Sequence, residues 1–190
     1  FTVVGNDIRF GLVAIKNIGE KFINLLMAER ESGGAFKSLE DFCRRMSGKE
    51  LNRRAVESLI QAGAFDSLGA KRRAMVQMLD QVLDSIADDG RKNVAGQLDL
   101  FGGEDGGAMT EVPVPQVDEY SRAELMAMER SVTGLYLTGH PMDEYREAVR
   151  RIGAAHIGAI LSSFDSPEES GGFADGQYVT VAGIVDSKRT

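Results

Sequence analysis

Residues 11–19 read Gly-Leu-Val-Ala-Ile-Lys-Asn-Ile-Gly, and this stretch decides the fold of the first part of the chain. Three of its apolar residues lie three positions apart, which is the spacing of one helical face: Leu12, Ile15 and Ile18. The pattern breaks over residues 17–20 and resumes from Phe22 until two glycines stop it at 33 and 34. The sequence therefore predicts a short helix, a tight turn and a longer helix.

The turn resembles the hairpin of a helix-hairpin-helix motif, whose usual Gly-hydrophobic-Gly appears here as Asn17-Ile18-Gly19. The resemblance implies that the hydrophobic residue holds the hairpin between the helices, and that the glycine lets a DNA backbone approach closely. The amides that open the second helix would then point at a phosphate, which the helix dipole also favours. Asparagine replaces the first glycine, and it tolerates left-handed backbone better than most residues. Lys16 and Lys21 flank the turn and are expected to add phosphate contacts.

A second, looser copy of this pattern follows. Asn52 is the predicted cap of a helix that Gly63 ends, and Lys71-Arg72-Arg73 opens a further helix to about residue 87. Between the copies, Ser38 and Asp41 resemble a capping box for a linking helix, with Asp in place of Glu. Two hairpins with cations at their turns indicate a paired module that grips duplex DNA without reading its sequence. The predicted DNA contacts are Lys16, Asn17, Ile18, Gly19, Lys21, Arg53, Arg54, Gly63, Lys71, Arg72 and Arg73.

Basic residues gather in the N-terminal part of an acidic chain. The net charge is −7, yet residues 1–80 hold 13 basic against 10 acidic side chains, and residues 81–190 hold 9 against 19. The acidic balance therefore does not exclude a nucleic-acid partner. A charge cluster is often only a solvated helix face, so the cluster alone does not establish one.

Residues 89–117 have the composition of a flexible linker, rich in glycine and acids and poor in apolar surface. Within it, Gln97-Leu98-Asp99-Leu100-Phe101 forms an apolar island. Composition leaves two interpretations open. The island is either a peptide that fills a partner's pocket or a hydrophobic turn that folds back onto its own domain.

This pentapeptide resembles the motif by which bacterial replication proteins bind the ring-shaped beta sliding clamp. The resemblance implies that Leu100 and Phe101 enter an apolar groove of the clamp, that Gln97 hydrogen-bonds at a smaller subsite, and that Leu98 is a secondary contact beside Asp99. Every position of the motif is filled.

A longer similarity links these parts. Residues 11–19, residues 51–66, the pentapeptide and Gly134-Leu-Tyr-Leu-Thr-Gly-His-Pro-Met142 occur in this order in the alpha subunits of bacterial DNA polymerase III. In that family this region follows the fingers and leads into an OB domain, while the catalytic palm lies upstream. The resemblance implies part of a DNA-directed DNA polymerase, a nucleotidyltransferase, that meets other replicase subunits through the parent protein.

The same resemblance implies that this chain is inactive alone. No catalytic residue, metal ligand or cofactor is expected in it, and Mg²⁺ is implied only for the parent polymerase. The start at Phe1, without methionine or signal peptide, favours a piece of a longer protein. No run is long and apolar enough to span a membrane, and the single Cys43, a predicted buried thiol, suits a reducing cytoplasm.

The expected architecture is mainly α. Residues 1–88 form a tandem helix-hairpin-helix domain, residues 89–117 a linker with the clamp peptide, and residues 118–175 a helical connector in which His140 is structural. Residues 176–190 begin a truncated OB-fold domain, whose first strand is predicted at residues 178–185.

Two other function classes remain as alternatives. Helix-hairpin-helix elements also occur in DNA glycosylases, where a carboxylate some twenty residues past the hairpin takes part in the chemistry, and Asp41 falls near such a place. The second alternative is a helical protein-interaction module that does not bind DNA.

Overall fold

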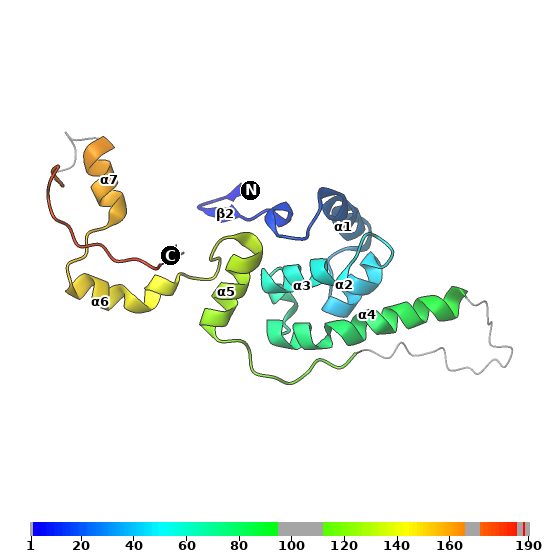
Figure 1. Cartoon of the computed structure of the whole chain (residues 1–190). Helices are drawn as coiled ribbons and strands as arrows, with labels where there is room; N and C mark the ends of the chain where they lie inside the picture. The colour runs from blue at the N-terminus through cyan, green and yellow to red at the C-terminus, as the bar shows by residue number, and fades with distance from the viewer. Residues whose placement is uncertain (1, 95–111, 166–171, 186–187, 189–190) are drawn as a thin grey trace. The chain divides into compact units, whose positions relative to one another are not determined.

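The computed structural model describes residues 2–94, 112–165, 172–185 and 188 (Figure 1). The chain divides into two units, residues 1–137 and residues 138–190. Helices dominate both, so the expectation of a mainly α protein is confirmed.

The first unit opens with a β-hairpin that the sequence reading missed. Strands β1 (Thr2–Val4) and β2 (Asp7–Arg9) pair antiparallel, with Val3 opposite Ile8. The turn between them needs a left-handed residue, and Gly5 supplies it at φ 62°. Gly-Asn between two short β-branched runs was the available signal.

The helical core of this unit contains both predicted hairpins. The 3₁₀ helix η1 (Leu12–Ala14) precedes α1 (Glu20–Gly33), which is followed by α2 (Leu39–Met46) and α3 (Arg53–Gln61). A second 3₁₀ helix, η2 (Asp66–Leu68), leads into the long helix α4 (Arg72–Val94). Figure 1 shows α2 and α3 between α1 and α4, and both contact α4.

Phe42 on α2 lies at the centre of the apolar core. Its ring meets Phe36 and Phe65 edge to face, with centroid distances of 5.0 and 4.8 Å. Phe65 comes from the second hairpin and Phe36 from the loop after α1, so this cluster joins the two copies. The neighbouring Cys43 is fully buried, and this burial, followed by the charge of Glu40, raises the pKa of its thiol to about 12. The prediction of a buried structural thiol is confirmed.

Predicted helix caps form where local sequence specifies them. Asn52 accepts from Ala55 N (2.9 Å), and Ser121 and Glu124 make both bonds of a capping box at α5 (Arg122–Thr133). Ser38 accepts from Asp41 N (3.0 Å), but the Asp41 carboxylate receives Lys37 N instead of completing the box. Only half of the capping box is therefore formed at α2.

Two predicted domain boundaries differ from the structure. Helix α4 continues to Val94, beyond the expected end of the first domain at residue 88, and Asp89 at its end is held by Arg44 (2.8 Å). Helix α5 packs against α3 within the first unit instead of belonging to a connector over residues 118–175. Its buried Glu129 and Val132 explain why it docks there.

The second unit holds η3 (Pro141–Tyr145), α6 (Arg146–Arg151) and α7 (Ile157–Asp165). This part of the expected helical connector thus consists of a 3₁₀ turn followed by two short α-helices. The Nδ1 atom of His140 accepts from Met142 N (3.1 Å), so this histidine caps η3 as a structural residue.

The predicted strand at residues 178–185 is not formed in the described part of the second unit. The segment is extended, and the Thr180 carbonyl accepts from Ala155 N (2.7 Å), but no neighbouring strand pairs with it there. A strand is defined by its ladder of hydrogen bonds to another strand, which a β-rich sequence cannot supply alone.

We expect Phe42→Ala to lower the free energy of unfolding by about 3–5 kcal/mol, because it empties the aromatic cluster between the two hairpins. Chemical denaturation followed by circular dichroism measures this loss. Val3→Ala is the control, since Val3 is 73% exposed and its truncation should change stability by less than about 0.5 kcal/mol. Equal losses in the two variants would contradict this account of the core.

Candidate nucleic-acid interface

The first hairpin turn is held in place by its hydrophobic residue and its asparagine. Ile18 is buried, and its amide donates to Ile15 O (3.3 Å). Asn17 adopts a left-handed backbone at φ 65°, the position that glycine usually fills in this motif. Its side-chain Nδ2 donates to Ser58 Oγ on α3 (2.9 Å). Asparagine therefore adopts the required turn and also ties the hairpin to the second copy.

The N-terminus of α1 is uncovered at Gly19. This N-cap has no side-chain hydrogen bond to the helix, whereas α2, α3 and α5 have side-chain caps. Gly19 has an ordinary backbone, with φ −93° and ψ 155°, and a Cβ added to it would meet nothing within 4 Å. Neither the backbone conformation nor internal packing of the described chain requires glycine here.

Two lysines lie beside this helix end. The Nζ atom of Lys16 donates to Ser131 O (2.6 Å), while its backbone amide donates to Val132 O (2.8 Å). Lys21 pairs with Glu50 (2.6 Å), and their side chains are 75% and 54% exposed. An ion pair this exposed is weak, so Lys21 can exchange Glu50 for another anion at little cost. Glu20 in the first turn of α1 is the one acidic neighbour in that turn.

The second hairpin turn has a different design. After α3, Gly63 N donates to Ile60 O and Ala64 N to Leu59 O (both 3.0 Å), which is the Schellman arrangement of a helix C-terminus. Gly63 adopts φ 78°, and a Cβ there would lie 2.8 Å from the Arg72 Cζ atom. Glycine is required at this turn both by the backbone and by the guanidinium that lies against it.

Arg72 lies inside the protein. Its guanidinium pairs with Asp66 (2.6 Å) and with the fully buried Glu129 of α5 (3.0 Å), and it also donates to Gln61 O (3.2 Å). The second oxygen of Glu129 accepts from Leu137 N (2.9 Å). Because the Arg72 side chain is only 5% exposed, we exclude it from the DNA-contacting surface.

The other predicted cations of the second copy divide into paired and open ones. Arg53 bonds Asp80 (2.6 Å) and Glu57 (2.7 Å). Lys71 Nζ donates to Val117 O (3.0 Å), and the Arg73 guanidinium lies 5.6 Å from the centre of the Tyr120 ring. Arg54 is exposed, and it has no ion pair within the described part of the chain.

A carboxylate occupies the N-terminus of α4. Glu119 accepts from Arg72 N (2.8 Å) and from Arg73 N (3.1 Å), one on each oxygen, and it also accepts from Tyr120 N (2.9 Å). Partial burial acts to raise the pKa of Glu119, but these backbone donors and the charge of Arg72 outweigh it. The pKa of this carboxyl group therefore lies below its ordinary value.

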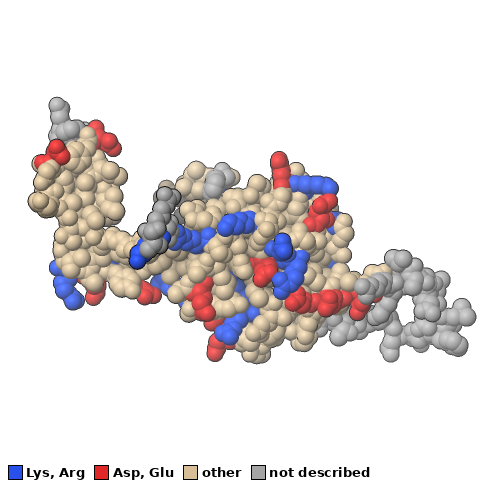
Figure 2. Space-filling model, in the orientation of Figure 1, with Lys and Arg blue, Asp and Glu red and all other residues tan. Residues whose placement is uncertain are grey.

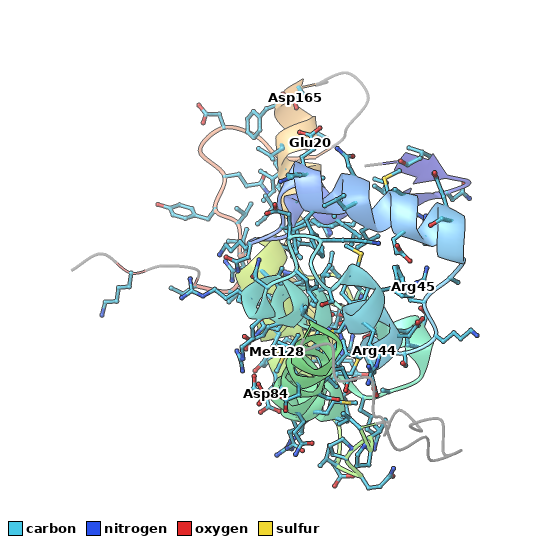
Figure 3. The ribbon with its side chains drawn as sticks, turned by 90° about the vertical axis from the view of Figure 1, so that its right-hand side faces the viewer. Glu20, Arg44, Arg45, Asp84, Met128 and Asp165 are labelled. Carbon is cyan, nitrogen blue, oxygen red and sulfur yellow. The ribbon has the colours of Figure 1, made fainter. Side chains whose placement is uncertain are left out.

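The basic cluster of Arg44, Arg45 and Lys49 is neutralised by acids. Arg44 pairs with Glu40 and Asp89, and Arg45 pairs with Glu29, which also binds Lys49. Arg45 in addition donates to the carbonyls of Glu29 and Gly34, at the end of α1 opposite Glu20 (Figure 3). On the face of residues 1–137 that Figure 2 shows, Lys and Arg lie interspersed with Asp and Glu. This face therefore carries no broad basic surface.

Two predicted sites remain, the clamp-binding pentapeptide and the Asp41 carboxylate. The pentapeptide Gln97–Phe101 lies outside the described residues. Asp41, the carboxylate of the glycosylase alternative, accepts from Lys37 N and pairs with Arg45 (3.4 Å), so its oxygens serve the start of α2. Within the described ranges, no group of His, Cys, Asp or Glu is arranged to hold a metal ion, and no helix has the length and hydropathy to cross a membrane.

We expect Glu129→Ala to destabilise the chain by about 3–5 kcal/mol, because it leaves the Arg72 guanidinium buried without its partner. Thermal and chemical unfolding measure the loss. The double variant Arg72→Met with Glu129→Leu should recover most of it, since apolar replacements remove both charges together. A double variant as unstable as Glu129→Ala would show that the loss comes from packing of α5 and not from the unpaired charge.

Comparison with known proteins agrees with this geometry. The family model of the helix-hairpin-helix motif matches residues 1–75. The chain is 40% identical over 149 residues to DNA polymerase III subunit alpha of Saccharopolyspora erythraea, covering 75% of this chain and 12% of that protein. It is 36% identical over 188 residues to the Mycobacterium leprae subunit, covering 97% and 15%, and 38% identical over 168 residues to that of Deinococcus radiodurans, covering 86% and 12%.

The chain thus spans 12% to 15% of the length of these relatives, and most of its own residues are matched. The matched motif covers the residues from β1 to the start of α4, and the expected similarity to bacterial DNA polymerase III alpha subunits is confirmed. Most of this chain is thus similar to one segment of those subunits.

Proposed function

We propose that this chain holds the backbone of duplex DNA through its first hairpin, and that it binds the beta sliding clamp through Gln97–Phe101, as a non-catalytic part of a DNA-directed DNA polymerase. The observation that carries the DNA proposal is the uncovered N-terminus of α1 at Gly19. The relatives are polymerase subunits by name, which supports a role in DNA replication.

Nothing in the described structure requires a glycine at position 19. Glycine destabilises the folded chain by its backbone entropy unless something requires it. Neither φ nor packing requires it here, so the missing side chain leaves room for a group that approaches from outside. The amides that open α1 carry the positive end of the helix dipole, so the group favoured there is an anion such as a DNA phosphate.

Cations around this helix end would strengthen the contact. Lys16 and Lys21 lie next to the turn, and Lys21 is held only by an exposed pair with Glu50. Arg54 lies one helical turn before Ser58, which binds Asn17, so both belong to the same face of α3. This face brings an open guanidinium towards the first hairpin. Contacts of this kind bind duplexes of any sequence, because they meet only the phosphates.

The clamp proposal rests on the fit of the pentapeptide to the motif and on how its flanks are held. Asp89 is paired with Arg44, and Val112 N donates to Glu40 Oε2 (3.0 Å), so both flanks are attached to α2. A clamp bound to Leu100 and Phe101 would thus be tethered close to the hairpins. Two modest contacts joined by a short tether hold a polymerase on its template far longer than either alone.

The parent polymerase supplies the rest. In this proposal, other parts of the parent polymerase carry out nucleotidyl transfer with Mg²⁺ and contact the other replicase subunits. The polymerase is proposed to act in the cytoplasm. No cofactor is proposed for this chain. The OB-fold assignment of residues 176–190 likewise remains a proposal, based on the resemblance to this family.

We expect Gly19→Ala to weaken duplex binding about tenfold, because a methyl group at the helix end keeps the phosphate from the amides. Unfolding stability should change by at most about 1 kcal/mol. Fluorescence anisotropy with a labelled duplex at low salt measures the affinity. Gly90→Ala is the matched control, because a Cβ there also meets nothing within 4 Å and Gly90 lies near the far end of α4. Unchanged affinity in Gly19→Ala would move the DNA site elsewhere.

The double variant Leu100→Ala with Phe101→Ala should abolish clamp binding while leaving the unfolding midpoint unchanged, because it removes both apolar anchors of the peptide. Titration with the purified clamp, followed by calorimetry, measures the affinity. Asp99→Ala serves as control, since the motif accepts a small residue at this position. A large loss of stability in the double variant would instead show that the pair folds back onto the chain's own core.

A further inference from the structure

The two hairpins differ in whether a side chain binds the amides at the N-terminus of the helix that follows the turn. At the first hairpin, the N-terminus of α1 has no side-chain cap. At the second, the equivalent amides of α4, Arg72 N and Arg73 N, are bonded to the two oxygens of Glu119. We infer that Glu119 acts as an internal stand-in for a DNA phosphate and closes the second hairpin, so that the duplex is gripped by the first hairpin alone.

The chemistry of the occupant matches the chemistry of the site. A carboxylate and a phosphate are both anions with oxygens that accept from adjacent backbone amides, and both are favoured by the positive end of a helix dipole. Glu119 takes one amide on each oxygen, at 2.8 and 3.1 Å, and leaves no room for a second anion on those amides. Its lowered pKa keeps it ionised, and therefore in place, at neutral pH.

The cations of the second turn also have internal partners, although Lys71 and Arg73 remain exposed. Lys71 donates to the Val117 carbonyl, and Arg73 faces the Tyr120 ring. Arg72, between them, is buried in its pairs with Asp66 and Glu129. At the first turn, Lys16 likewise donates to a carbonyl, that of Ser131, but Lys21 is engaged only by an exposed carboxylate. Each cation that would assist a phosphate at the second turn already has an internal partner.

The segment that carries Glu119 is attached at several points. We call residues 112–120 the strap. Val112 packs on the apolar core and bonds Glu40, Val117 receives Lys71, and Tyr120 lies under Arg73. Glu119 is therefore delivered to α4 by an ordered stretch of backbone, and an incoming phosphate would have to displace the strap.

A simpler role would be that Glu119 merely caps α4. The two roles differ in what its removal does to DNA binding. A cap alone gives lower stability and no new affinity, whereas a closed phosphate site opens when the carboxylate is removed. Glu124 offers a comparison, because its carboxylate receives one amide at the start of α5, that of Ser121, and none of the amides of α4, although the charge of Arg73 also acts on it.

The test is the salt dependence of duplex binding by the full chain, with Glu119→Ala, Glu119→Gln and Glu124→Ala compared with the unchanged protein. We expect Glu119→Ala to bind a labelled duplex about two- to fivefold tighter at low salt. Its plot of log K against log salt should steepen by about 0.9, the value for one added phosphate contact. Glu119→Gln should show the same change to a smaller degree, because an amide binds the helix end less strongly than a carboxylate. Glu124→Ala should leave the slope unchanged.

This inference rests on the proposed duplex binding, and the experiment separates the two. No salt-dependent binding by the unchanged protein would overturn the proposed function. Binding by the unchanged protein with an unaltered slope in both Glu119 variants, folded as judged by circular dichroism, would overturn only the inference. An equal gain in duplex affinity in Glu124→Ala would also overturn the inference, since the loss of any negative charge would then explain the gain.

Discussion

The buried guanidinium of Arg72 is the constraint on which the first unit depends. It joins four parts of the chain: Asp66 in η2, the Gln61 carbonyl at the end of α3, Glu129 in α5, and α4, to which it belongs. Gly63 must lack a side chain because this guanidinium lies against it. Burying two charges is tolerable only when their hydrogen bonds are satisfied; here Asp66 accepts two from the guanidinium, and the Gln61 carbonyl and Glu129 accept one each. The second turn is therefore built around an internal cation.

That constraint separates the roles of two hairpins with the same topology. In the first, the turn is stabilised by the buried Ile18 and by the Asn17 bond to Ser58, which leaves the amides of α1 uncovered. In the second, the buried Arg72 holds the turn, and Glu119 accepts hydrogen bonds from the amides that open α4. In the proposed function, the first hairpin binds an anion at its helix start, whereas the amides that open α4 hold the strap through Glu119.

In the proposed function, affinity for DNA comes from oriented amides more than from a basic surface. Arg44, Arg45 and Lys49 lie close together in the sequence, yet each is paired with an acid. Paired charges add little long-range attraction. An acidic chain with a few open cations beside one helix end suits a segment of a DNA polymerase III alpha subunit, whose relatives are much longer than this chain.

The sequence by itself determined the local events: the left-handed Asn17, the caps at Ser38 and Asn52, and the break at Gly63. These depend on residues within a few positions of one another, which a pattern can reveal. Only the tertiary structure decided that Arg72 is buried, that α5 docks on the first unit, and that Glu119 occupies α4. Arg72 and Glu129 lie 57 positions apart, and Arg72 and Glu119 lie 47 apart. A cation that opens a helix has the same local pattern whether it faces a phosphate or a distant carboxylate, so only the folded chain distinguishes them.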